Sequence, residues 1–256
     1  MVVLVPPSRE DLLPWMLRFL QDKEHADGIR VLEEYGWDFR ILGGLIERVR
    51  RAARAYILLE KQGFSAEGRS LVRSALEHAV TAQWAFLTPN GVDRLEVQLL
   101  QARVDYAKNS QDANDPEWDE LIERMKTQIP HNLNGSRRRG MPKFSGKGNV
   151  LESLDETGYL QRAYAVLSRA GHVTDQAVTD YFVEDGEVVA VASGPSDVHD
   201  IDVFHTLATS CCLAAWVLAR MEGDARGLEL ATAQGLLWRL DTHLPAESRR
   251  FPAETD

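Results

Sequence analysis

The amino-acid sequence predicts a predominantly all-α protein: a long antiparallel helical hairpin, additional packed helices, and one small β-hairpin near residues 181–192. Three observations support this class: an apolar stripe with steps of three and four residues, turn signals between helical segments, and one pair of β-branched runs. The stripe spans roughly residues 28–61 in a heptad pattern and consists of Leu32, Tyr35, Phe39, Leu42, Ile46, Val49, Ala53 and Tyr56. Because helical proteins with an extended seam often pair, we expect a homodimer.

Turn and capping residues define the second half of the helical hairpin. We expect Gly63 to end the long helix and Ser65, followed by Glu67, to begin the next one. Pro89 and its neighbours should end that second helix. Its apolar stripe, which would pack against the first helix, is Val72, Ala75, Leu76, Ala79, Ala82 and Phe86.

The remaining helices are expected over residues 92–110, 116–128, 152–170, 197–221 and 224–242. The runs 181–183 and 188–192 flank Asp185-Gly186, a dipeptide typical of hairpin turns. A two-stranded hairpin is marginally stable alone, so we expect it to lie against the helices. Because the sequence shows no repeat and no second core, we expect residues 1–256 to form a single domain with a short flexible tail over 245–256.

Composition excludes several classes of protein. The chain has 29 Lys+Arg and 39 Asp+Glu, a net charge of −10, which argues against a general polyanion binder but allows a local basic patch. The densest apolar run, Cys211–Ala219, is nine residues, well short of the roughly 18–20 that a membrane span needs, so we expect no membrane association. With only Cys211 and Cys212, a disulfide framework is excluded; we expect a cytoplasmic protein in which both thiols are buried.

Residues 130–150 differ from the rest of the chain. They contain four glycines, two prolines and five cations but no acid, which is typical of an exposed, mobile loop. A cluster of cations in such a loop favours phosphate contacts, so a nucleic acid is the expected polyanionic partner. The candidate nucleic-acid-binding residues are Arg137, Arg138, Arg139, Lys143 and Lys147.

Two polar groups lie beside the predicted apolar stripes. Arg73 and Glu77 are four residues apart on one helix, which is the spacing of an ion pair that could either fix helix docking or border a site. Tyr164 and Ser168 share the face of another helix, with His172 just past its end. A histidine there could act as an acid–base group near neutral pH or cap the last carbonyls of the helix.

These residues lie in short motifs that resemble a bacterial family of helical proteins of unknown function. The motifs are Arg73-x-x-x-Glu77, Phe144-Ser145-Gly146, Asp155-Glu156-x-Gly158 and Tyr164-x-x-Leu167-Ser168-x-x-x-His172, followed by the hairpin. The resemblance covers about residues 30–90 and 140–192 and departs at Phe144, where the family usually has tryptophan. It implies a helical fold related to the HEPN (higher eukaryotes and prokaryotes nucleotide-binding) superfamily and a binding or regulatory role in defence or stress, with no established reaction and no cofactor. The candidate site residues are then Arg73, Glu77, Tyr164, Ser168 and His172.

Two enzymatic alternatives stay open. A HEPN-like ribonuclease would use His172 or His78 on the 2′-hydroxyl of RNA and Arg73 to stabilise phosphorane charge, although His172 has no arginine at the spacing that these enzymes use. A metal-dependent HD-type phosphohydrolase would use a set of histidines and aspartates. We expect no metal, because the acids near residue 200 would stabilise the first turn of a helix. The set that could be placed on the phosphohydrolase scheme is His172, His199, Asp200 and Asp241.

Overall fold

The structure, a computed structural model, describes residues 8–21, 29–110, 116–131, 139–144, 149–155, 157–170, 182–185, 188–191 and 200–237. In chain order its helices are α1 (Arg9–Gln21), α2 (Gly36–Lys61), α3 (Arg69–Leu87), α4 (Gly91–Ser110), α5 (Pro116–Thr127), α6 (Val150–Leu154), α7 (Tyr159–Ala170), α9 (Asp200–Glu222) and α10 (Ala225–Leu237). A 3₁₀ turn, Glu33–Tyr35, precedes α2. Helix dominates the described residues, so the all-α class is confirmed.

Two short strands complete the described elements. Strands β1 (Phe182–Asp185) and β2 (Val188–Val191) pair antiparallel, with Phe182 opposite Val191 and Asp185 opposite Val188. The expected packing of these strands against the helices stays a prediction. The expected tail, residues 245–256, lies outside the described residues.

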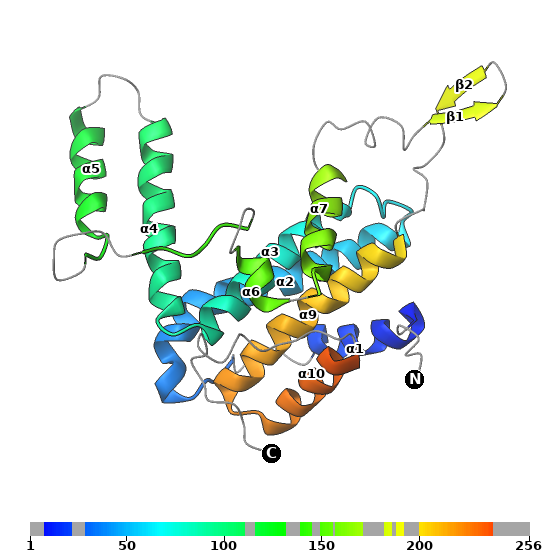
Figure 1. The fold of residues 1–256 in the computed structure, drawn as a ribbon, viewed down its shortest axis with the longest axis horizontal. Helices are drawn as coiled ribbons and strands as arrows, with labels where there is room; N and C mark the ends of the chain where they lie inside the picture. Colours follow the sequence, from blue (N-terminus) through cyan, green and yellow to red (C-terminus); the bar gives the residue numbers. More distant parts are fainter. Residues whose placement is uncertain are drawn as a thin grey trace.

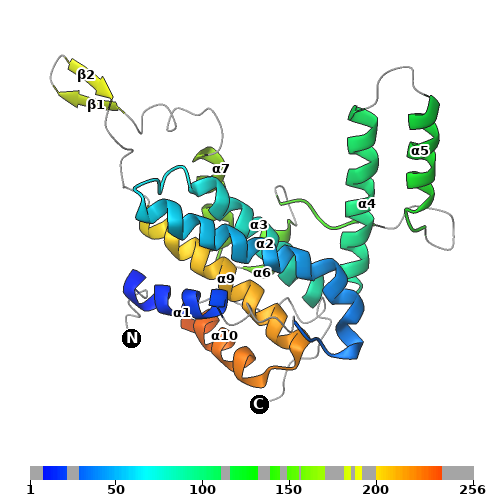
Figure 2. The same ribbon diagram turned by 180° about the vertical axis from the view of Figure 1, so that it is seen from behind.

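Helices α2, α3 and α9 lie side by side and form the centre of the molecule (Figure 1). Figure 2 shows α1 and α10 on one side of this group and α7 on the other. Helix α9 is apolar around most of its circumference because it packs against α1, α2, α3, α7 and α10. The main core lies between these helices, and its largest fully buried side chains include Met16, Leu42, Ile46, Tyr56, Leu76, Phe86, Leu207 and Leu218.

The predicted heptad stripe of α2 is used within the chain. Leu42, Ile46, Val49, Ala53 and Tyr56 are each at most 2% exposed, and they belong to the main core with α3 and α9. The first predicted member of the stripe, Leu32, lies before α2 and is 44% exposed. The five buried positions are covered by helices of the same chain, so they do not support the homodimer that the sequence suggested.

The start of α3 differs from the sequence prediction. The helix begins at Arg69 rather than near Ser65, and its N-cap residue, Gly68, provides no side-chain cap. A β-carbon at Gly68 would lie 2.7 Å from the Tyr56 ring, so the chain passes close to α2 before it becomes helical. Gly63 ends α2 as expected, with a φ of 82°.

The single helix expected over residues 152–170 is divided into α6 and α7. Gly158, with a φ of 71°, separates them. The buried carboxylate of Asp155 accepts hydrogen bonds from the backbone amides of Thr157 at 2.9 Å and Leu160 at 2.7 Å. Asp155 therefore caps the first turn of α7 and makes a new helix start there more favourable than continuation of α6.

Helix α1 was not anticipated from the sequence. It is held by its last turn, where the carbonyl of Leu20 accepts hydrogen bonds from the guanidinium groups of Arg50, at 2.9 Å, and Arg54. Arg50 is 3% exposed and also lies over the Phe19 ring. Two α2 cations therefore satisfy the carbonyl end of α1, where the helix dipole is negative.

Part of α4 and the whole of α5 project from the central helices (Figures 1 and 2). We call residues 97–110 and 116–129 the α4–α5 arm. In the part of the chain that the structure describes, the arm has its own small apolar cluster, although no second core was expected from the sequence. Its buried members are Val97, Val104, Ala107, Ile122 and Ile129.

One described helical segment, Val203–Glu222, is long and apolar enough to cross a membrane, and 83% of its most apolar window is buried inside the protein. The same length and composition occur in core helices and in membrane spans. Localisation therefore stays a prediction.

The two adjacent thiols of α9 give a prediction. Burial raises the pKa of Cys211 to about 12, against a small opposing effect of Arg50, and burial with the neighbouring Cys211 raises the pKa of Cys212 as well. We expect Ellman's reagent to label neither thiol of the folded protein at about pH 8 and to label both in concentrated guanidinium chloride. The chain has no third cysteine, so the readout is unambiguous. Because burial raises the thiol pKa, folding favours the neutral form of both thiols. Their contribution to the free energy of unfolding is therefore complete below the unfolded thiol pKa of about 8.5, and it is lost as the pH rises toward the thiol pKa of the folded protein. Rapid labelling of the native protein would contradict this burial.

Candidate functional site

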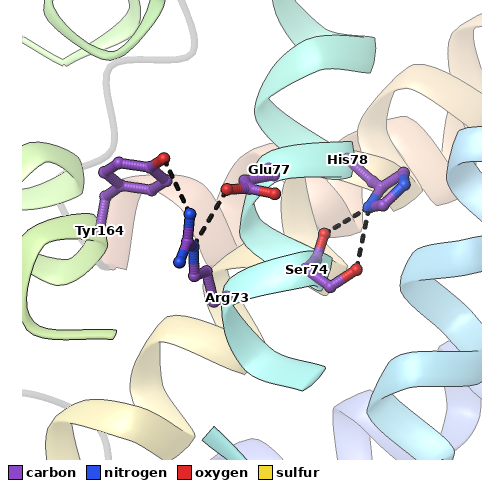
Figure 3. A network of polar contacts seen from close by, with 5 residues as sticks. All are labelled: Arg73, Ser74, Glu77, His78 and Tyr164. Carbon is purple, nitrogen blue, oxygen red and sulfur yellow. Dashed lines mark hydrogen bonds and ion pairs between the residues drawn. The ribbon is translucent and has the colours of Figure 1, made fainter. Parts of the chain in front are cut away.

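Arg73 and Glu77 form an ion pair on the face of α3 that lies toward α7 (Figure 3). Nε of Arg73 donates to Oε1 of Glu77 at 3.1 Å. The two side chains are 27% and 32% exposed, so this pair is neither fully solvated nor buried. The four-residue spacing alone would give an exposed pair worth about 0.3–0.5 kcal/mol.

Tyr164 of α7 adds a long-range contact to this pair. Nη2 of Arg73 donates to the Tyr164 hydroxyl oxygen at 3.3 Å, and the guanidinium carbon lies 5.3 Å from the centroid of the ring. Partial burial lowers the pKa of Arg73, but the hydrogen bond to Tyr164 and the charge of Glu77 outweigh it, so the net pKa is raised. The contact joins residues that are 91 positions apart in the sequence, and it attaches α7 to α3.

Phe144, which lies in a segment without regular secondary structure, extends the contact between Arg73 and Tyr164. The ring of Phe144 lies parallel to that of Tyr164, with centroids 5.7 Å apart and planes at 20°. We call Arg73, Glu77, Tyr164 and Phe144 the α3–α7 joint. The carbonyl of Lys143 accepts a hydrogen bond from the amide of Val150 at 3.1 Å, which attaches the residue before Phe144 to the start of α6.

The other end of this segment is held by Arg94 of α4. Its Nε and Nη2 donate to the carbonyl of Gly140 at 3.2 and 3.0 Å, and its guanidinium carbon lies 4.8 Å from the centroid of the Trp84 ring. Burial and the nearby positive charge of Arg139 both lower the pKa of Arg94. Between the two anchors, Met141 is 8% exposed and belongs to the main core.

We call residues 139–144 the cationic segment. The expectation of an exposed loop is wrong for Met141, whose apolar side chain is more stable in the core than in water. Arg139 and Lys143 are exposed, and neither forms an ion pair with any residue that the structure describes. The other three candidate cations, Arg137, Arg138 and Lys147, lie outside the described residues.

His78 is not joined to Arg73. Figure 3 shows His78 and Ser74 on the side of α3 away from Tyr164. Nδ1 of His78 contacts both the carbonyl oxygen and the hydroxyl of Ser74. A site that combines His78 with Arg73 is therefore not formed by this arrangement.

Ser168 lies one turn after Tyr164 on α7, and its hydroxyl is buried with no hydrogen-bond partner in the described part of the chain. His172, which belongs to the same candidate site, lies outside the described residues, as do His199 and Asp241 of the phosphohydrolase scheme. Within the described ranges, no group of three or more His, Cys, Asp or Glu side chains could hold a metal ion.

Sequence reasoning did not find Arg94, which holds the other end of the cationic segment. Its partner is a backbone carbonyl 46 residues away, so no spacing within α4 marks it. The only local signal is a cation beside the apolar positions Val92 and Leu95, which is common on any amphipathic helix.

A family model described as "Family of unknown function (DUF5677)" matches residues 39–188, more than half of the chain. The matched part includes the α3–α7 joint, Arg94 and the cationic segment, whereas α1, α9 and α10 lie outside it. No curated protein and no solved structure matches the chain.

A double-mutant cycle tests the energy of the α3–α7 joint. Tyr164→Phe removes the hydroxyl acceptor but keeps the ring, so we expect it to lower the free energy of unfolding by about 0.5–1.5 kcal/mol in urea titrations. Arg73→Met should remove the same bond, and the double variant should therefore lose less than the sum of the two single losses.

Tyr106→Phe is the matched control, because Tyr106 is 74% exposed and should tolerate the change within about 0.5 kcal/mol. Strictly additive effects of Arg73→Met and Tyr164→Phe would show that the contact contributes nothing.

Proposed function

The chain belongs to the DUF5677 family of unknown function, and from this premise we propose that it is a binding protein that holds single-stranded RNA on its cationic segment. One observation carries the proposal: Arg139 and Lys143 are exposed without an ion pair among the described residues, on a segment whose backbone is bonded at Gly140 and Lys143.

Fixed, unpaired cations suit phosphate binding for two reasons. Their charge is not already neutralised by the protein, so contact with phosphate releases counterions from the nucleic acid. Their backbone is already ordered, so binding costs less conformational entropy than it would in a free loop. Arg139 can also donate two parallel hydrogen bonds to one phosphate, which a lysine cannot do.

The charge of the whole chain favours a local site over general binding. The net charge of −10 repels a polyanion at long range, so the cationic segment must act at short range. The exposed ring of Tyr106, on the α4–α5 arm, offers a surface on which an unpaired base could stack. This supports a single strand rather than a duplex, whose bases are not available for stacking.

In this proposal Arg73, Glu77 and Tyr164 are positioning residues. Nε and Nη2 of Arg73 donate to protein groups, so they are engaged before any phosphate arrives. No observation favours the ribonuclease that would use Arg73 with His78 or His172, and none favours the HD-type phosphohydrolase. The regulatory role in defence or stress, the cytoplasmic localisation and the homodimer remain predictions.

The salt dependence of RNA binding tests the proposal. We expect a fluorescent 12-nucleotide RNA of uridines to bind, with log Kd depending linearly on log salt concentration. The double variant Arg139→Gln/Lys143→Gln should bind more weakly, and its slope should fall by about 1.4, because each single-strand phosphate contact contributes about 0.7.

The matched control is Arg51→Gln/Lys61→Gln, which removes two exposed cations from α2, and it should bind like the wild type. An unchanged slope in the Arg139→Gln/Lys143→Gln variant would remove the cationic segment as the site. Equal affinity for the matching DNA strand would contradict the choice of RNA. We expect the RNA to be recovered intact; cleavage that is lost in His172→Ala would favour the ribonuclease instead.

A further inference from the structure

A cavity of about 410 Å³ lies at the base of the α4–α5 arm, beside the cationic segment. One wall is α4, which contributes side chains at successive turns, and the other is residues 139–142, which Figure 1 shows running from the arm toward α6. The volume lies within the roughly 300–1,000 Å³ typical of small-molecule sites. The residues that carry the argument are Val97, Gln98, Gln101, Asp105, Arg139 and Met141.

The two walls approach closely because Gly140 has no side chain. A β-carbon there would lie 3.3 Å from Oε1 of Gln98, and Arg94 fixes the distance by its two hydrogen bonds to the Gly140 carbonyl. The inner part of the cavity is apolar, since Val97, Ile129 and Met141 line it and are each at most 8% exposed. A flat, partly apolar ligand would therefore gain contact area on entering.

The polar side chains of the cavity offer both an acceptor and a donor. Nε2 of Gln101 donates to Oδ1 of Asp105 at 2.9 Å, which fixes the carboxylate and leaves Oδ2 able to accept. Arg139 brings a guanidinium that pairs with no acid in the described part of the chain. One negative and one positive group together favour a ligand that is itself neutral and presents donors on one edge and acceptors on another.

We infer that this cavity binds a guanine base. Guanine carries two adjacent donors, N1–H and N2–H, which match a carboxylate, and two adjacent acceptors, O6 and N7, which match a guanidinium. Adenine and cytosine each place a ring-nitrogen acceptor next to their amino group, and uracil places carbonyls on both sides of its only N–H. Each of these three would bring at least one lone pair against the Asp105 carboxylate.

This inference rests on the proposed RNA binding and names the base that the same site would select. Lys143 then meets the phosphate next to the guanosine, while Asp105 and Arg139 read the base. The lysine therefore supplies affinity, and the carboxylate with the guanidinium supplies discrimination, which is the usual division between phosphate and base contacts.

The test uses the full-length protein and three 12-nucleotide RNAs of uridines that differ at one central position: guanosine, inosine or adenosine. We expect the guanosine strand to bind about tenfold more tightly than the adenosine strand, the order expected for a bidentate base contact. Inosine lacks the N2 amino group but keeps N1–H, O6 and N7, so its strand should fall between the two.

Asp105→Asn should abolish the preference for guanosine, because an amide nitrogen then faces the base donors, and its affinity for the all-uridine strand should not fall. Asp119→Asn removes the same charge from α5 and is the matched control; it should keep the preference. Equal binding of the three strands by the wild type would overturn the guanine site, and a preference that persists in Asp105→Asn would overturn the role of Asp105.

Free GMP and AMP, titrated by calorimetry, separate this inference from the proposed function. One outcome is that the wild type prefers GMP to AMP, Asp105→Asn removes this preference, and no RNA strand binds. That outcome would support the guanine site and overturn RNA binding. Salt-dependent binding of all strands without selectivity, together with no preference for GMP, would support RNA binding and overturn the guanine site.

Discussion

The contact between Arg73 and Tyr164 is the constraint on which the rest of the site depends. α3 is fixed in the main core by side chains that are fully buried, whereas α7 and the cationic segment reach that core from a distant part of the chain. Besides the apolar packing of α7 in the core, one guanidinium connects α7 to α3, since it pairs with Glu77 on its own helix and bonds to Tyr164, whose ring stacks on Phe144. A motif whose spacing resembles an ordinary surface ion pair therefore helps to fix where the cationic segment lies.

The cationic segment combines two properties that usually exclude each other. Its cations are exposed, as a phosphate site requires, yet its backbone is held by Arg94, by the burial of Met141 and by the stacking of Phe144. Side chains that are free to meet a ligand thus project from an anchored chain. This reduces the entropy that binding must overcome, and it places the same segment as one wall of a cavity.

The sequence was sufficient to predict which side chains are buried where apolar residues follow the helical repeat. The stripe of α3 and the part of the α2 stripe from Leu42 to Tyr56 are buried where the three- and four-residue steps place them, because a helix can bury only one face against its neighbours. The sequence was insufficient to predict a side chain's hydrogen bond where the partner is a backbone atom or a residue far away in the chain. Arg94 bonds to a carbonyl, and Asp155 caps a helix from inside a stretch whose pattern favoured one continuous helix. The proximity of Arg73 to Tyr164 was suggested only by the family resemblance, since nothing in the spacing of either helix encodes it.

The most direct measurement of the central claim is amide hydrogen exchange at Val150, whose N–H donates to the carbonyl of Lys143. Exchange there requires the end of the cationic segment to detach, so its rate reports the stability of that attachment. In Arg73→Met we expect this amide to exchange about tenfold faster, the change that a loss of about 1.4 kcal/mol of local stability produces, while Arg51→Met leaves it unchanged. Identical exchange rates at Val150 in the wild type and in Arg73→Met would contradict the claim that the joint holds the segment.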